Sequence, residues 1–92
     1  MYLITVEGKE DEGAYSVTNE DGEQVLYLFE DEDDAVRFAM MLESRDGYPG
    51  MHVMEVEDDL IIKACDINGY QYSIFTPYDI IIPPEEESND FI

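Results

Sequence analysis

The sequence predicts an α+β fold, a two-layer sandwich in which two helices cover one face of an antiparallel or mixed sheet of about five strands. Three observations predict it. Short segments that alternate apolar and polar residues recur along the chain. Two longer segments place apolar residues at helical spacing. These segments follow one another in the order β-β-β-α-β-α-β, which favours a ferredoxin-like topology.

The first part of the chain predicts three strands. Residues 1–6 alternate apolar and polar side chains, and residues 14–18 do so again after a polar, glycine-bounded loop. Asn19-Glu20-Asp21-Gly22 then predicts a hairpin turn, in which the glycine suits a positive φ. Residues 24–29 are apolar on both faces, which is typical of a central strand.

The first helix is expected over residues 33–45, where the period changes from two to about 3.6. Its apolar stripe has the spacing i, i+3, i+4, i+7 and consists of Ala35, Phe38, Ala39 and Leu42. Asp31 or Glu32 is expected to open this helix, and Asp46-Gly47 to close it.

The second part predicts a strand over residues 51–57 and a short helix over residues 59–67, for which Asp58 is the expected N-cap. Leu60, Ile61 and Ala64 are expected to share one face of that helix, and Asn68-Gly69 to end it. A last strand follows over residues 70–75.

A single domain is therefore expected over residues 1–82, followed by a disordered acidic tail over residues 83–92. The tail begins with two prolines and three glutamates, a composition that cannot bury a core. Its final Phe91-Ile92 pair is apolar, which leaves two interpretations open: fraying terminal residues or a short docking motif.

The charge balance excludes several function classes. With 24 Asp and Glu against 4 Lys and Arg, the formal net charge is −20, which opposes binding to nucleic acid and to anionic membrane. The apolar runs are too short for a membrane span, and the single cysteine is typical of a reducing compartment. A cytoplasmic location is therefore expected.

The candidate site is a run of five consecutive acids, Glu30, Asp31, Glu32, Asp33 and Asp34, directly before the first helical stripe. Acids are common at helix N-termini because they accept hydrogen bonds from free N–H groups and interact favourably with the macrodipole. Five exceed what capping requires, so a patch for a basic partner is the second interpretation. A calcium loop would need alternating ligands and a turn glycine, so no metal site is predicted.

The sequence contains no coherent catalytic set. His52 and Cys65 are single, and neither has an orienting group that the sequence identifies, so packing or surface roles are favoured over a catalytic pair. No glycine-rich phosphate loop follows a strand, and few cations are present to stabilise an anionic transition state. We therefore predict a protein that is not an enzyme and uses no cofactor.

Tyrosines at strand spacing predict part of the core and, where they project from an uncovered face, an aromatic recognition patch; they are Tyr2, Tyr15, Tyr27, Tyr70 and Tyr72. An exposed strand edge beside such a patch would also allow a homodimer, which like-charge repulsion opposes at low salt.

Residues 25–43, with their strand, acids and helix, resemble the core of a small family catalogued as domain of unknown function 3110. Further similarities are the Asp11-Glu12-Gly13 loop, Cys65, Gly69-Tyr70 and Pro83-Pro84-Glu85, so the resemblance covers most of residues 1–85. It implies a cyanobacterial, plastid or cyanophage setting, and it implies no activity and no catalytic residue.

Three function classes follow. The leading hypothesis is a small regulatory or adaptor protein that docks on a basic surface of a partner protein. The second is a mimic of nucleic acid that occupies a DNA- or RNA-binding groove. The third is a metal-dependent or ligand-binding domain, which would show a defined stoichiometry.

Overall fold

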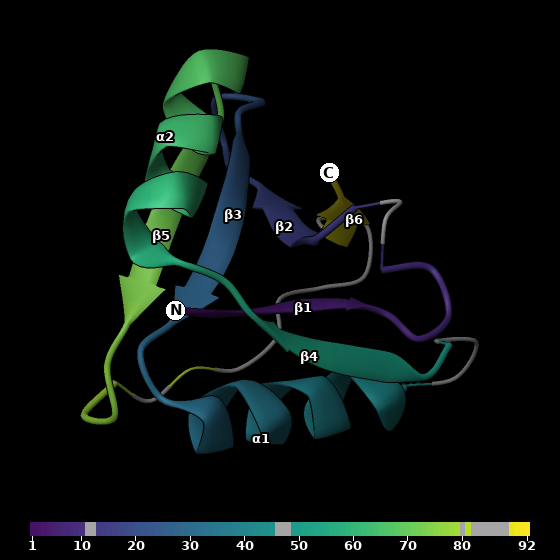
Figure 1. Ribbon diagram of the computed structural model, residues 1–92. Helices are drawn as coiled ribbons and strands as arrows, with labels where there is room; N and C mark the ends of the chain where they lie inside the picture. The colour runs from purple at the N-terminus through teal and green to yellow at the C-terminus, as the bar shows by residue number, and fades with distance from the viewer. Residues whose placement is uncertain (11–12, 46–48, 80, 82–88) are drawn as a thin grey trace.

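The computed structural model describes residues 1–10, 13–45, 49–79, 81 and 89–92, and Figure 1 shows how its strands and helices are arranged. Within these residues the elements are β1 (Tyr2–Val6), β2 (Tyr15–Thr18), β3 (Gln24–Phe29), α1 (Glu32–Glu43), β4 (Met51–Glu55), α2 (Asp58–Asn68), β5 (Gln71–Phe75) and β6 (Asn89–Phe91). The predicted α+β class is confirmed, and the predicted element boundaries agree to within two residues.

Strand β3 organises the sheet, because it pairs with three other strands. It is antiparallel to β2 and to the start of β1, and parallel to β5 from Val25–Gln71 through Phe29–Phe75. Strand β4 extends the sheet beyond β1, and β6 extends it beyond β2. The sheet is therefore mixed, and β3 is the central strand that its apolar sequence predicts. The ferredoxin-like topology stays a prediction.

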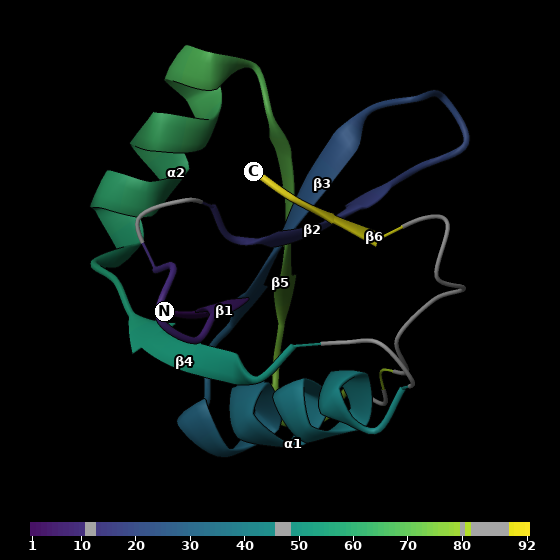
Figure 2. The same cartoon turned by 90° about the vertical axis from the view of Figure 1, so that its right-hand side faces the viewer.

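The two helices cover opposite faces of the sheet, so the prediction that both lie on one face is wrong (Figures 1 and 2). Helix α1 packs on the face to which Ile4 and Phe29 point, together with the buried Phe38. Helix α2 packs on the other face, where Cys65 meets Leu3 and Leu28. Since β3 alternates apolar residues between its two faces, each face needs its own cover.

An aromatic cluster fills the α1 side of the sheet. Tyr15 is fully buried, and its ring contacts Tyr27, Phe38 and Phe91 edge to face, with ring centroids 5.4 to 5.8 Å apart. Phe75 of β5 contacts Tyr27 at 4.8 Å. Such pairs add about 0.5–1.5 kcal/mol beyond the area that they bury.

Local signals explain where the elements begin and end. The Asp31 carboxylate caps α1 by accepting a hydrogen bond from the Asp33 N–H at 2.8 Å. Asn19 closes the β2–β3 turn, because its side-chain oxygen accepts from the Asp21 and Glu23 N–H groups. Gly69 ends α2 in the left-handed conformation, with φ of +74°. The predicted end of α1 at Asp46-Gly47 lies outside the described residues.

The end of the chain is not a frayed tail. Residues 89–91 form β6 on the edge of β2, where Ala14 and Ile92 exchange two backbone hydrogen bonds. Phe91 joins the core on the α1 side, and Ile92 joins the core on the α2 side. The prediction of disorder is therefore wrong for residues 89–92. Burial of the Phe91 and Ile92 side chains and pairing with β2 offset the conformational entropy that these residues lose on ordering. Residues 82–88 lie outside the described part of the chain.

Candidate functional site

The five acids of the predicted site have two different roles in the structure. Asp31 is the N-cap of α1, and Asp34 accepts a hydrogen bond from Arg37 at 3.0 Å. Both therefore act within the fold, which supports the capping interpretation for part of the run. Glu32, Asp33 and Asp34 also occupy the first turn of α1, where negative charge interacts favourably with the helix dipole.

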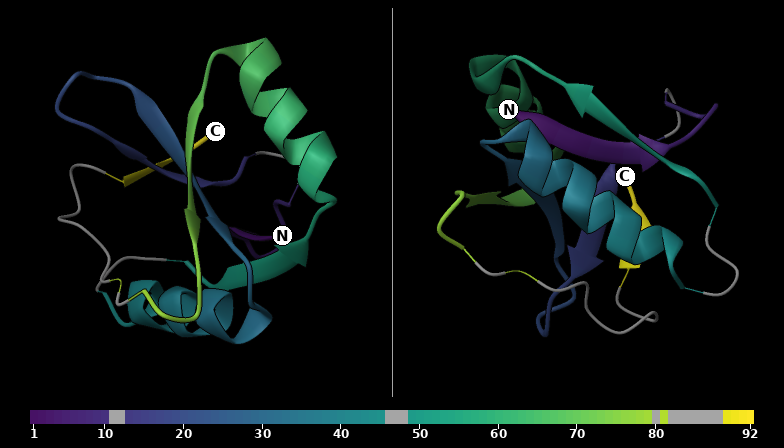
Figure 3. Two further views of the ribbon diagram at one scale, coloured as in Figure 1. Left: turned by 90° about the vertical axis from the view of Figure 1, so that its left-hand side faces the viewer. Right: turned by 90° about the horizontal axis from the view of Figure 1, so that it is seen from below.

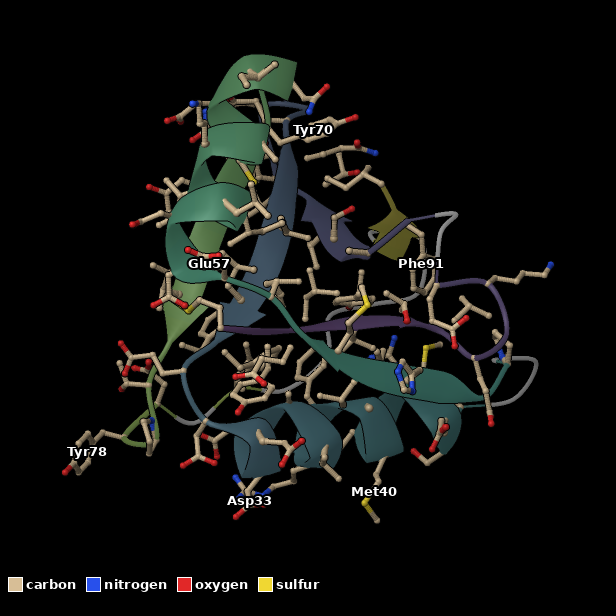
Figure 4. All side chains as sticks on the ribbon, viewed as in Figure 1. Asp33, Met40, Glu57, Tyr70, Tyr78 and Phe91 are labelled. Atoms are coloured by element: carbon tan, nitrogen blue, oxygen red, sulfur yellow. The ribbon has the colours of Figure 1, made fainter. Side chains whose placement is uncertain are left out.

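Glu30, Glu32 and Asp33 are the members of the run that face solvent. Figure 4 shows Asp33 projecting from the outer side of α1, away from the sheet. Among the described residues, none of these three carboxylates takes part in an ion pair. Their charge is therefore available to an external group.

A carboxylate from β4 adds to this group. Glu55 lies opposite Tyr2 in the β1–β4 ladder, and its charge is the main cause that raises the pKa of the Tyr2 hydroxyl above 10.0. Burial and the charges of Glu32 and Asp31 raise that pKa further. The acids before α1 and the end of β4 thus act on the same hydroxyl, and we define Glu30, Asp31, Glu32, Asp33 and Glu55 as the acidic edge.

A cavity of about 340 Å³ lies beside the acidic edge, between α1 and the turn that follows β5. Asp34, Arg37 and Met41 line it from one face of α1, at the helical spacing i, i+3, i+7. Its remaining described walls come from the ends of two neighbouring strands and from the turn, namely Phe29, Phe75, Thr76, Pro77, Asp79 and Ile81. Sequence reasoning did not find this cavity, because it joins two stretches that are far apart in the chain, one that contains Phe29 and α1 and another that begins at Phe75. Only the spacing of the lining residues on α1 gave a signal.

Hydrogen bonds within the turn stabilise the part of the cavity wall that it forms. The Asp79 carboxylate accepts hydrogen bonds from the Thr76 N–H at 2.7 Å and from the Thr76 hydroxyl at 3.2 Å. The Asp79 N–H in turn donates to the Thr76 carbonyl. Tyr78, at the tip, projects into solvent (Figure 4). This wall is therefore formed by a closed turn and not by an open loop.

His52 and Cys65 differ in their surroundings. His52 is exposed on β4, whereas Cys65 is buried on the side of α2 that faces the sheet. Burial raises the pKa of the Cys65 thiol, and the charge of Asp66 raises it further. A nucleophilic cysteine needs the opposite shift, because the thiolate is the reactive form. Asp66 to Gly69 form the end of α2, which confirms the predicted helix end.

Within the described residues, no three His, Cys, Asp or Glu side chains converge in a way that could hold a metal ion. Over the same residues, neither helix combines the length and the apolar character that crossing a membrane requires.

The aromatic and apolar residues at the α2–β5 end include several exposed side chains. Helix α2 lies beside β5 (Figure 3), and Tyr70, between these two elements, is partly exposed (Figure 4). Tyr72 is partly exposed as well, and α2 presents Leu60 and Ile67 to solvent. The prediction that Leu60, Ile61 and Ala64 share one face of α2 is wrong for Leu60, which is 66% exposed, whereas Ile61 and Ala64 are half-buried. In the described sheet β5 pairs with β3 alone, so its second edge is unpaired.

Comparison with known proteins gave one result. A family model described as "Domain of unknown function (DUF3110)" matches residues 2–85 of the 92-residue chain. The match spans β1 through β5, and so it includes the acidic edge and the described walls of the cavity. No match was found among curated proteins, and none among solved structures.

Proposed function

Because the chain belongs to the family described as domain of unknown function DUF3110, whose description assigns no activity, we propose a function from its surface. It is a non-enzymatic regulatory or adaptor protein that docks through its acidic edge on a basic surface of a partner protein. The observation that carries this proposal is the exposure of Glu30, Glu32 and Asp33 without ion-pair partners in the described structure.

Capping alone does not account for these three carboxylates. Asp31 already supplies the side-chain cap of α1, and Asp34 is held by Arg37. Like charges close together also repel one another, which offsets part of the stabilisation that Glu32 and Asp33 gain from the helix dipole. A basic partner would neutralise that repulsion, so the cluster would contribute to binding as well as to the stability of α1.

The expected consequence is fast, salt-dependent association. An acidic surface on a protein of net charge −20 draws a basic partner from beyond contact distance, and it repels acidic competitors. At about 0.15 M salt the screening length is about 8 Å, so part of this steering persists under cellular conditions. Rim charges mainly change the association rate and its salt dependence, so these are the quantities to measure.

The test is capture of a partner with matched charge variants. The wild type is immobilised and exposed to a lysate of a cyanobacterium, the setting that the family resemblance implies, at low and moderate salt. The test variant carries Glu30→Gln, Glu32→Gln and Asp33→Asn. The control carries Glu20→Gln, Asp21→Asn and Asp66→Asn, three exposed acids elsewhere on the molecule with the same total charge change.

We expect one dominant partner whose association rate with the purified protein falls in the test variant and holds in the control. Equal loss in both variants would show that only net charge matters and would refute docking through the acidic edge. Release of DNA or RNA from the captured partner would instead identify a mimic of nucleic acid, whereas a ternary complex would argue against that mimicry.

A further inference from the structure

We propose that the cavity between α1 and the turn after β5 is a binding site for an organic cation, a primary ammonium or guanidinium group on an apolar stem. This goes beyond docking on a basic surface, because it assigns a defined pocket and a ligand class. It depends on the geometry of the cavity and holds whether or not the acidic edge has a protein partner.

The apolar part of the cavity fits the stem of such a ligand. Phe29 and Phe75 end two adjacent parallel strands, and their rings lie 5.5 Å apart at the inner wall. Met41 adds a flexible thioether from α1, and Pro77 and Ile81 add further apolar surface. A volume of about 340 Å³ is at the small end of ligand sites, so it suits a small molecule or one side chain.

The polar part of the cavity contains the Asp34 carboxylate, one oxygen of which has no hydrogen-bond partner among the described residues. Only 11% of the Asp34 side chain is exposed, and its Oδ1 accepts the hydrogen bond from Arg37. Its Oδ2 is buried and has no hydrogen-bond partner. A buried acceptor without a partner is costly and calls for an explanation, which a donor from a bound ligand would supply.

The charge around the cavity selects a cation. Two carboxylates, Asp34 and Asp79, and one guanidinium, Arg37, line it, within a protein of net charge −20. Arg37 is 67% exposed, so its pair with Asp34 is a surface ion pair and contributes little. An anion would meet net repulsion there, whereas an N–H donor that is also positive gains a charge-assisted hydrogen bond.

The test uses ¹⁵N-resolved NMR titrations of the full chain with four small probes of similar size, at about 150 mM NaCl to screen diffuse attraction. The probes are n-butylguanidinium, n-butyltrimethylammonium, n-butanol and butyrate. We expect saturable binding of n-butylguanidinium with a dissociation constant of about 1 mM, the range that so few atoms allow. Its shift changes should be confined to the cavity walls.

The other three probes separate the contributions of positive charge, of N–H donation and of the apolar stem to binding. The quaternary ammonium has the charge but no N–H, so at least about fivefold weaker binding is expected if Asp34 Oδ2 accepts a hydrogen bond. The alcohol should bind weakly, and the anion should not bind. Equal binding of the two cations would refute the role of Asp34, and absence of saturable binding would refute the site.

Variants test the same point on the protein. Asp34→Asn should weaken binding of n-butylguanidinium by about tenfold, whereas Asp33→Asn, its exposed neighbour, should change it by less than about twofold. Arg37→Gln removes a competing cation from an exposed position and should strengthen binding by a few fold, so the inference stays testable if Asp34→Asn folds poorly. Equal weakening by both aspartate changes, or weaker binding in Arg37→Gln, would overturn it.

The cation can come from a free amine or from an arginine side chain of another protein. A blocked tripeptide, acetyl-Gly-Arg-Gly-amide, distinguishes the two sources, because its backbone must remain outside the cavity. Binding as tight as that of n-butylguanidinium would indicate a partner's side chain, and binding only of the free probe would indicate a small metabolite. Failure of every cation probe would refute this site and leave the docking proposal to its own test.

Discussion

Replacing Phe91 with alanine tests whether the end of the chain is an integral strand of the sheet. The Phe91 ring lies 5.8 Å from that of Tyr15 and packs against the α1-side core, although part of it remains exposed. Truncation of a fully buried phenylalanine costs about 3–5 kcal/mol. A half-buried one should cost about half of that, so we expect Phe91→Ala to lower the free energy of unfolding by about 2 kcal/mol.

The assay is urea unfolding followed by circular dichroism at fixed salt. A domain of this size loses about 1 kcal/mol of stability per molar urea, so the midpoint should fall by about 1.5–2 M. Hydrogen exchange of the Ala14 amide should accelerate as well, because that amide donates to the Ile92 carbonyl. Tyr78→Ala is the control, since Tyr78 is 94% exposed and its loss should leave the midpoint unchanged.

Equal midpoints for Phe91→Ala and the wild type, with unchanged exchange at Ala14, would refute the assignment of β6 to the sheet. A fall in the midpoint without faster exchange at Ala14 would show that Phe91 contributes to the core by another route than through β6.

Three further predictions concern the C-terminal end of α2, the N-cap of α1, and the Cys65 thiol and Tyr27 hydroxyl, whose pKa values are raised. Gly69→Ala should lower the unfolding free energy by about 1 kcal/mol, because a Cβ there meets no atom but the φ of +74° disfavours it; an unchanged urea midpoint would contradict this. Asp31→Ala should cost about 1 kcal/mol through loss of the α1 cap, whereas Asp31→Asn should keep the cap and cost less, and equal midpoints for the two variants would contradict that assignment. Burial raises the pKa of Cys65 above 9.0, aided by Asp66, and burial raises that of Tyr27 above 10.0. The folded state therefore keeps these protons after the unfolded chain has lost them, so the urea midpoint should fall as the pH rises above about 9, and a constant midpoint up to about pH 10.5 would count against it.

Much of the fold could be predicted because local patterns specify it. The period change after Phe29 places α1, the Asn19 side chain closes the predicted turn, and Gly69 ends α2. The placement of the helices could not be predicted in the same way, since it depends on which face of β3 each stripe covers. Yet the clue was present, because Leu28 and Phe29 are both apolar and point to opposite faces.

The candidate site was only partly predictable. The acids before α1 stand together in the sequence, but only the fold separates the cap Asp31 and the paired Asp34 from the three that face solvent. Glu55 joins them through the β1–β4 register, which no local pattern encodes. The cavity depends on the parallel pairing of β3 with β5, which joins residues 46 positions apart in the chain.

That parallel pairing also affects how the molecule is made. During synthesis β3 emerges well before β5, so one whole edge of the central strand has no partner until the chain beyond α2 has been translated. Until then Leu26, Leu28 and Phe29 belong to an incomplete sheet, a state that favours strand-to-strand association with other chains. The strong negative charge of the nascent segment, including the acids that directly follow β3, would keep such chains apart until β5 docks.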